Sequence, residues 1–244
     1  MLLRRITKHI KDQNWFAVGV DFVIVVVGVF IGIQVANWND TRNNEAALKA
    51  SLARLDKEVT QNLDLIHNVL GYYKKGQHNY TRGREALNTC DASNDGQAAL
   101  EALLFDLVSD VQPNFTTVAL DQLAGESRYQ GLLTPQFEAD FGAYAGRLRE
   151  EHEQLTSHYE RMWAQHVNYH PAVTAYFPGD NETGGGEWRF ALAQPFETVC
   201  ADTEFRTRFI HSIGFYWSIG RRLDRLKGEI ETFQTSLAAE LERH

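Results

Sequence analysis

The chain has few prolines, few cysteines and no excess of positive charge. Only five prolines occur in 244 residues, and Ala, Leu, Glu and Gln are abundant, which favours helices. Low-complexity tracts are missing, and a content of 43% hydrophobic and 23% charged residues excludes wholesale disorder and collagen-like chains. The net charge of −8 argues against nucleic-acid binding, which requires cations to neutralise phosphates. The length fits one large domain or two small ones.

Sequence signatures of catalysis are also missing. The chain contains no G-x-S-x-G motif and no Cys–His pair with a recognisable local signature. Glycines 184–186 are followed by Glu187 and Trp188 instead of the Lys and Ser/Thr that a phosphate-binding loop needs. We therefore expect a protein that is not an enzyme and that needs no cofactor.

The amino-terminal region contains the one long apolar run of the chain. Residues 22–33 are uninterrupted by polar side chains, and their flanks extend the run to about 20 residues, the length that a bilayer span requires. Trp15 and Trp38 lie at its two ends, where indoles favour the lipid headgroup region. We therefore expect a transmembrane helix over residues 15–38.

The charges before this run predict its orientation. Residues 1–14 contain four Lys or Arg side chains and one Asp, so the positive-inside rule keeps this tail in the cytoplasm. Residues 39–244 would then lie in the periplasm of a bacterium, anchored in the inner membrane. A cleaved signal peptide is the competing interpretation, but cutting after Ala36 would leave Gln34 where a small residue is expected.

One face of the predicted membrane helix has the features of an interaction surface. The face is formed, at spacings of three and four residues, by Asp21, Val25, Gly28, Gly32 and Val35. The two glycines form a GxxxG pair, which lets two helices approach closely, and a membrane-embedded acid is costly unless it pairs. The alternative is an Asp that reaches the membrane edge beside glycines that are common in membrane helices. The first interpretation predicts a homo-oligomer or another membrane protein as partner, besides the lipid bilayer itself.

Beyond the membrane helix, apolar residues recur at helical spacing in three long segments. The first stripe consists of Leu48, Leu52, Leu55, Val59, Leu63, Ile66, Leu70 and Tyr73. Glycines 71, 76 and 83 indicate bends or a break in that helix. Thr134 and Pro135 mark the start of a second helix that ends before Pro171, and a third runs from about Thr203. Short helices are expected over 97–111 and 116–124, and a short strand or irregular stretch near Phe190. The predicted fold is all-α, an antiparallel helical bundle continuous with the membrane helix.

The membrane segment resembles a known group of proteins. A charged tail, a Val/Ile-rich span ending in GIQVANWN (residues 32–39) and an acidic helical stalk resemble a family of uncharacterised bacterial single-pass inner-membrane proteins. A central T-x-x-x-L-x-x-x-G pattern of that family can be laid on Thr116, Thr117, Leu120, Leu123 and Gly125. The chain has Tyr144 and Ala145 where the family prefers an aromatic pair. The resemblance implies the topology and a helical exterior, and it implies no activity.

The two cysteines fall at the same predicted end of the bundle. Cys90 ends the first long helix, and Cys200 precedes the last one, which returns toward the membrane. A disulfide between them would be favoured in an oxidising compartment, and two buried free thiols are the alternative.

Histidines suggest a second kind of function. His158, Met162 and His166 recur every four residues, and His170 continues the series before Pro171. On a helix such side chains suit copper or zinc, although exposed or core histidines explain the same pattern. The leading hypothesis is a non-catalytic interaction, assembly or sensor-like subunit of the membrane. The alternative is a periplasmic metal-binding protein or metalloenzyme.

Overall fold

The computed structural model describes residues 15–108, 113–129, 131–177 and 188–244. Helices dominate these ranges, so the predicted all-α class is confirmed. The helices are α2 (Trp15–Thr89), α3 (Asn94–Val108), α4 (Val118–Ala124), α5 (Pro135–Ala164), α6 (Phe196–Ala201) and α7 (Thr203–Arg243). Two short 3₁₀ turns, η1 (Ser127–Tyr129) and η2 (Val167–Tyr169), lie between them. One antiparallel hairpin pairs β1 (Val173–Tyr176) with β2 (Arg189–Leu192), and only β2 lies where the sequence indicated a strand.

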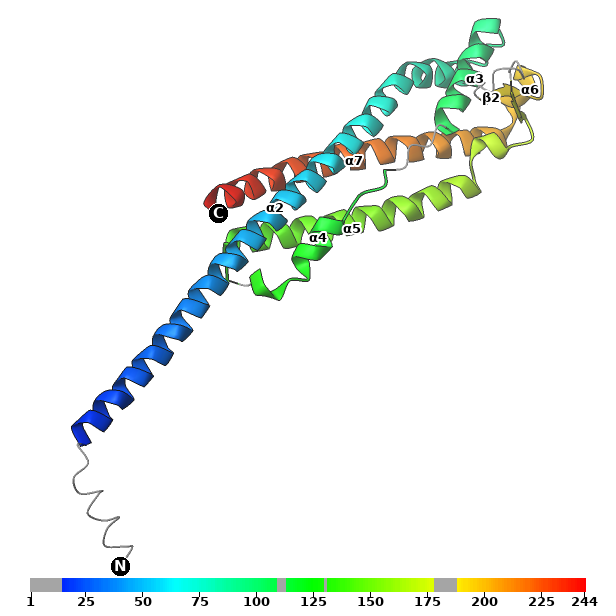
Figure 1. Cartoon of the computed structure of the whole chain (residues 1–244). Helices are drawn as coiled ribbons and strands as arrows, with labels where there is room; N and C mark the ends of the chain where they lie inside the picture. Colours follow the sequence, from blue (N-terminus) through cyan, green and yellow to red (C-terminus); the bar gives the residue numbers. More distant parts are fainter. Residues whose placement is uncertain (1–14, 109–112, 130, 178–187) are drawn as a thin grey trace, which may run out of the picture.

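Helix α2 is continuous over 75 residues and curves near its distal end (Figure 1). A break at its glycines was therefore the wrong alternative, and two of these glycines instead make room for neighbouring elements. A Cβ atom on Gly83 would lie 2.7 Å from the Ala99 carbonyl oxygen of α3. One on Gly76 would lie 2.6 Å from the Tyr216 hydroxyl of α7. Close packing against α3 and α7 explains these glycines better than a helix end does.

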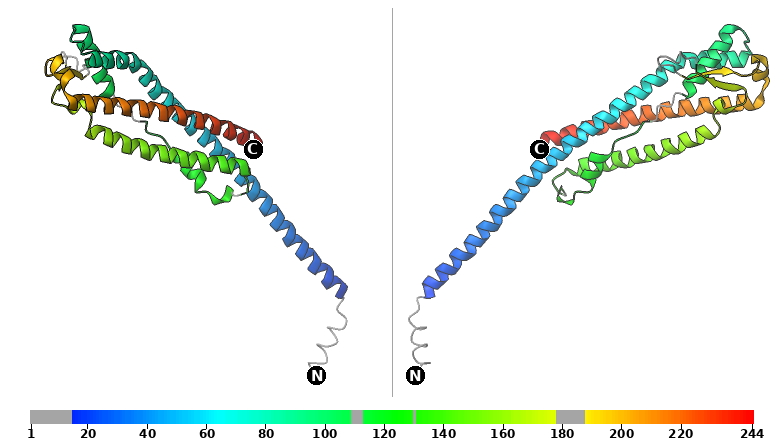
Figure 2. Two further views of the ribbon diagram at one scale, coloured as in Figure 1. Left: turned by 180° about the vertical axis from the view of Figure 1, so that it is seen from behind. Right: turned by 45° about the vertical axis from the view of Figure 1, so that its right-hand side comes forward.

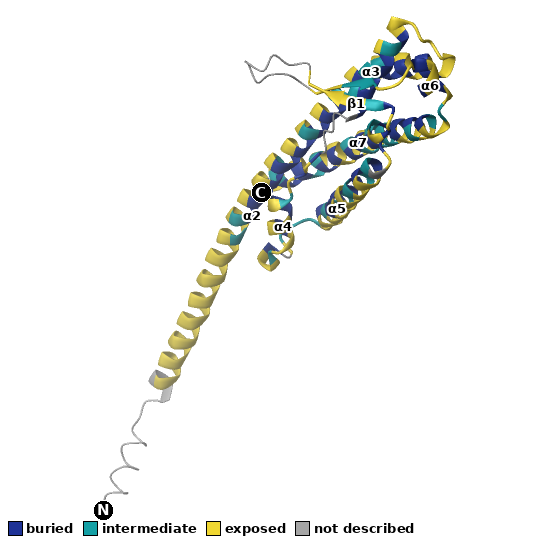
Figure 3. Ribbon diagram, turned by 90° about the vertical axis from the view of Figure 1, so that its right-hand side faces the viewer, coloured by how far each residue is buried: buried dark blue, intermediate teal, exposed yellow. Residues whose placement is uncertain are grey.

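The first part of α2 projects away from the rest of the molecule (Figure 3). Side chains 18–43 are all exposed, and this part contains the one described helical segment that is long and apolar enough to cross a membrane. Burial begins at Leu48, and the predicted stripe then forms the core face, with Leu52, Leu55, Val59 and Ile66 fully buried.

Helix α7 runs back along α2, and α5 lies along α7 (Figures 1 and 2). The Tyr216 hydroxyl lies 3.3 Å from the Tyr73 carbonyl oxygen, and Gln234 further along α7 contacts Thr60 nearer the amino end of α2. The buried apolar side chains form two cores. The proximal core is built from α2, α4, α5 and α7. The distal core is built from the end of α2, α3, α6 and the start of α7.

Local caps explain where the two long helices α5 and α7 begin. Thr134 accepts a hydrogen bond from the Phe137 amide, and Pro135 occupies the first turn of α5, as the sequence predicted. Asp202 accepts hydrogen bonds from the Glu204 and Phe205 amides at the start of α7.

The end of α5 differs from the prediction. The helix stops at Ala164 because His166 turns to an extended conformation and caps η2 by accepting from the Asn168 amide. The Val167 amide then donates to the Ser212 hydroxyl of α7, so a tertiary contact replaces another helical turn.

Candidate functional site

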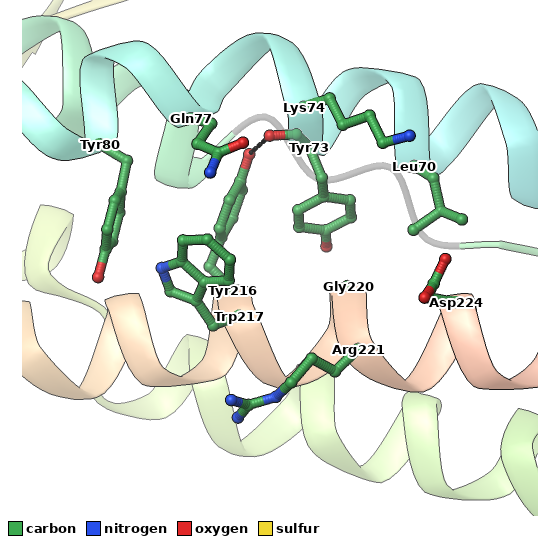
Figure 4. A pocket seen from close by; sticks show the side chains of 10 residues that line it. All are labelled: Leu70, Tyr73, Lys74, Gln77, Tyr80, Tyr216, Trp217, Gly220, Arg221 and Asp224. Atoms are coloured by element: carbon green, nitrogen blue, oxygen red, sulfur yellow. Dashed lines mark hydrogen bonds between the residues drawn. The ribbon is translucent and has the colours of Figure 1, made fainter.

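A pocket of about 270 Å³ lies between α2 and α7 at the distal end of the α2–α7 contact (Figure 4). We call it the α2–α7 pocket. Its largely apolar walls are formed by Leu70, Tyr73, Tyr80, Tyr216, Trp217 and Gly220. Its polar side chains are Lys74, Gln77, Arg221 and Asp224. The lining therefore consists of one face of each of two helices that are far apart in the sequence.

Aromatic rings hold the two walls of the pocket together. The Tyr73 and Tyr216 ring centroids are 4.3 Å apart, and the Tyr216 hydroxyl donates a hydrogen bond to the Tyr73 carbonyl oxygen. Tyr80 and Trp217 meet edge to face, with their centroids 5.1 Å apart. Such ring pairs are geometrically specific, so they fix the separation of α2 and α7 along part of the pocket.

Two acidic groups behind the pocket have raised pKa values. Burial raises the pKa of the Tyr216 hydroxyl, and the nearby Tyr73 and Asp106 reinforce the effect, so the phenol stays protonated. Burial also raises the pKa of the Asp106 carboxyl, opposed by the hydrogen bond that the Asn79 amide donates to it at 2.9 Å. Asp106 is therefore an additional acidic group close to the pocket, beside the Tyr216 hydroxyl and Gly76.

The charged side chains that line the pocket form no ion pairs with the residues that the structure describes. Lys74 on α2 and Arg221 on α7 make no ion pair there, and neither does Asp224, one turn beyond Arg221. Two cations and one carboxylate thus remain available to a bound molecule.

A second hollow of about 280 Å³ lies next to the first, and Tyr80 lines both. It adds Arg84 and Arg206, and the Arg84 guanidinium lies 5.5 Å from the centre of the Tyr80 ring. The two hollows therefore combine four cations with one carboxylate in a chain whose net charge is −8. The sequence shows arginines at 206, 208, 221, 222 and 225 of the last helix, but it does not show that two of them lie beside the first helix.

Two buried carboxylates outside the pocket have hydrogen-bond or ionic partners on neighbouring elements. Glu58 of α2 accepts hydrogen bonds from the Ala119 and Leu120 amides at 2.7 and 3.1 Å, so it caps α4 from another helix. Glu151 of α5 pairs with Arg147 at 2.7 Å and with Arg222 of α7 at 2.9 Å. Sequence reasoning missed these residues, although an acid at a core-facing helical position was an available signal.

A tyrosine beside this network is also shielded from water. The Tyr144 ring stacks on Phe233 with centroids 4.3 Å apart, and burial raises the pKa of its hydroxyl to about 12. These polar groups stabilise the packing of α2, α4, α5 and α7, which is a structural role.

The structure joins Cys90 and Cys200 in a disulfide, with their Cα atoms 5.7 Å apart. The bond links the end of α2 to the end of α6, just before α7 begins, and it closes a loop across 110 positions. It therefore ties the distal ends of the two helices that line the pocket.

The predicted membrane face lies on the exposed part of α2. Asp21, Val25, Gly28, Gly32 and Val35 are all exposed, and nothing lies within 4 Å of a Cβ placed on either glycine. The face is thus available for contact, and its role as an interaction surface stays a prediction.

The three candidate metal ligands do not share one helix. His158 and Met162 belong to α5, whereas His166 lies beyond its end and is fully buried. Its Nδ1 accepts from the Asn168 amide, its Nε2 lies 3.2 Å from the Leu107 carbonyl oxygen, and burial lowers its pKa to about 4. A metal ion at His166 would have to displace one of these bonds.

Further acids and histidines do not complete such a site in the described ranges. No group of three His, Cys, Asp or Glu side chains there is arranged to hold a metal ion. The metal hypothesis stays a prediction, and elemental analysis of the purified chain for copper and zinc tests it.

Comparisons with known proteins found no matching family model, no similar curated protein and no similar solved structure. The resemblance to single-pass bacterial membrane proteins therefore stays an expectation from residues 32–39 and their surroundings.

Proposed function

We propose that the chain is a single-pass bacterial inner-membrane protein that acts as a non-catalytic interaction, assembly or sensor-like subunit. Residues 1–14 would lie in the cytoplasm, 15–38 in the bilayer and 39–244 in the periplasm. The exposed apolar part of α2 has the length for a span, and the cationic tail favours this orientation. The Cys90–Cys200 bond suits an oxidising compartment such as the periplasm.

The observation that carries the proposal is the continuity of α2. One helix extends from the exposed apolar segment to the disulfide, and no loop separates the segment from the proximal core. A rotation or shift of α2 within the exterior domain would consequently be transmitted into the bilayer. Such rigid coupling suits a subunit that passes a mechanical signal to a partner or holds a partner in register.

The partner would contact the membrane face of α2. An unpaired Asp21 costs a few kcal/mol in the bilayer, which a hydrogen bond across a helix–helix contact would reduce. Gly28 and Gly32 would let the second helix approach closely at the same face. The partner is a second copy of this chain or another membrane protein.

The test is purification from native membranes in a mild detergent, with mass spectrometry of the proteins that remain bound. We expect a stoichiometric partner or a homo-oligomer that is lost in Gly28→Ile and in Asp21→Leu. Gly19→Ile is the matched control, because Gly19 lies on the opposite face, about 160° from Asp21 around the helix. Association that persists in both face variants would contradict the membrane-face proposal.

A further inference from the structure

We propose that the α2–α7 pocket binds a small uncharged aromatic molecule, such as indole or a phenol, between the rings of its two walls. The inference goes beyond the proposed function, because it assigns a ligand to the helical bundle. It holds whether or not the membrane face of α2 binds a partner.

Aromatic side chains form most of the apolar wall of the pocket. Tyr73 and Tyr80 extend from α2 into the space between the helices, and Tyr216 and Trp217 extend from α7 (Figure 4). Leu70 adds an aliphatic side chain at one end. A planar ring could therefore meet both walls through the stacked and edge-to-face contacts that aromatic rings prefer.

The pocket has room for such a ring. Trp217 remains 36% exposed although it lies at a helix–helix contact, so aromatic surface is left for a ligand to cover. The volume of about 270 Å³ lies near the lower end of the range of about 300–1,000 Å³ that is typical of ligand pockets. The pocket therefore suits a molecule of one or two rings.

The charged side chains around the pocket do not converge on one point. Figure 4 shows the Lys74 ammonium and the Arg221 guanidinium turned away from each other, so they form no joint site for an anion. The two nearby acids are separate as well. Asp106 lies beside the Tyr216 hydroxyl, whereas Asp224 is eight positions further along α7, about 12 Å along the helix axis.

The two arginines of the neighbouring hollow do not add a charge to this pocket. The Arg84 guanidinium lies 5.5 Å from the centre of the Tyr80 ring, and Arg206 donates a hydrogen bond to the Cys200 carbonyl oxygen at 3.4 Å. Neither arginine lines the α2–α7 pocket. A charged ligand would lose its hydration among apolar walls without gaining a cluster of opposite charge, which favours an uncharged ligand.

Gly220 allows the pocket to be filled by a substitution. Gly220 lines the pocket, and a Cβ atom on it would meet no atom within 4 Å. A leucine side chain there would therefore occupy the space of the ligand. Gly228, about two turns further along α7, is equally open and does not line the pocket. Gly228→Leu is thus a matched control with the same gain in helix propensity.

The experiment titrates the full chain, reconstituted in lipid nanodiscs, with indole and with phenol, and follows the ligands by saturation-transfer NMR. Empty nanodiscs measure how much of each compound dissolves in the lipid. We expect saturable binding of both compounds above that background. Gly220→Leu should reduce the binding to the background, and Gly228→Leu should leave it unchanged. Far-UV circular dichroism of each variant establishes that it is folded.

Analogues and a wall variant test the ring and the charge separately. Cyclohexanol, a saturated ring, should bind about fivefold more weakly than phenol. Phenylacetate and phenethylammonium, which carry one charge of either sign, should each bind about tenfold more weakly than phenol. Trp217→Leu should weaken phenol binding about fivefold, and Trp217→Phe should restore most of it.

Several results would overturn the inference. Unchanged binding in folded Gly220→Leu would locate the site elsewhere, and equal affinity for cyclohexanol would remove the aromatic specificity. A preference for phenylacetate or phenethylammonium would show that charge governs recognition. Failure of indole and phenol to bind the folded wild-type chain would reject the ligand class. None of these readouts depends on partner co-purification, so this inference and the proposed function fail separately.

Discussion

The proximal and distal ends of the α2–α7 contact use the same two helices in different ways. At the proximal end, α4 and α5 cover the contact, and the buried carboxylates of Glu58 and Glu240 accept hydrogen bonds from neighbouring elements. At the distal end, a pocket separates the helices, and Lys74, Arg221 and Asp224 have no ionic partners among the described residues.

This difference separates stability from binding along one pair of helices. A fully partnered buried charge contributes to a fixed arrangement, and it has no capacity left for a ligand. An open wall with unpaired charges contributes little to folding and retains that capacity. The proximal end therefore stabilises the helical bundle, and the α2–α7 pocket is a part of the contact that has room for a ligand.

The largest expected effect compares one substitution at two positions of α2, one inside the packed core and one at the wall of the α2–α7 pocket. Leu55→Ala should lower the free energy of unfolding by about 2–5 kcal/mol, because it leaves a cavity in the fully buried proximal core. Leu70→Ala should cost clearly less, because Leu70 already borders the open pocket. Chemical denaturation of both variants, followed by circular dichroism, measures the difference. Equal losses would show that the pocket wall at Leu70 is as tightly packed as the core around Leu55.

A second comparison concerns two carboxylates. Glu58→Ala should cost about 1.5–3 kcal/mol, since the amides of Ala119 and Leu120 lose their charged acceptor. Asp224→Ala should stay within about 0.5 kcal/mol of the wild-type chain, because Asp224 has no such bonds. The same denaturation experiment applies, with Glu58→Gln as a variant that retains one acceptor. A destabilising effect of Asp224→Ala as large as that of Glu58→Ala would break the comparison.

Features set by local sequence could be predicted. The stripe from Leu48 to Tyr73 has the period of a helix with one buried face, and Thr134–Pro135 combines a cap with a residue suited to the first turn. Each signal lies within a few neighbouring residues, so no tertiary contact was needed to interpret it.

Features set by contacts between distant parts of the chain could not be predicted from the sequence. The α2–α7 pocket depends on Tyr73 meeting Tyr216, 143 positions away, and neither residue carries a local sign of the other. The early end of α5 depends on Ser212 binding the Val167 amide, so helical spacing wrongly extended the helix to His166. Glu58 has the pattern of a core position, but its partners come from the start of α4.

Two glycines of α2 distinguish a tight contact from an open one. Gly83→Ala should destabilise by about 1–3 kcal/mol, because its Cβ would lie 2.7 Å from the Ala99 carbonyl oxygen, and α3 would have to move. Gly71→Ala should stabilise by about 0.5–1 kcal/mol, because nothing lies near that position and alanine favours the helix. Thermal unfolding of the two variants gives the sign directly. Stabilisation by Gly83→Ala would mean that α3 packs less closely than the structure indicates.

The smallest expected effect is the acid sensitivity of the proximal end, at Glu240 of α7. Burial raises the pKa of this carboxyl, but hydrogen bonds from Arg243 and from the Thr134 amide and hydroxyl outweigh it, so the pKa is lowered. A lowered pKa means that the carboxylate stabilises the folded chain fully above the unfolded-state pKa of about 4.3. This contribution is lost as the pH falls through the pKa of the folded state.

Glu240→Gln should therefore have a lower melting temperature than the wild-type chain at pH 6, and its melting temperature should decline less steeply between about pH 4.5 and 3. Melting curves of the two chains at these pH values measure the effect, with Glu242→Gln as a control on the same turn whose pH profile should follow the wild-type chain. Parallel declines of wild-type and Glu240→Gln chains would show that the bonds to Thr134 do not link the end of α7 to the start of α5 in solution.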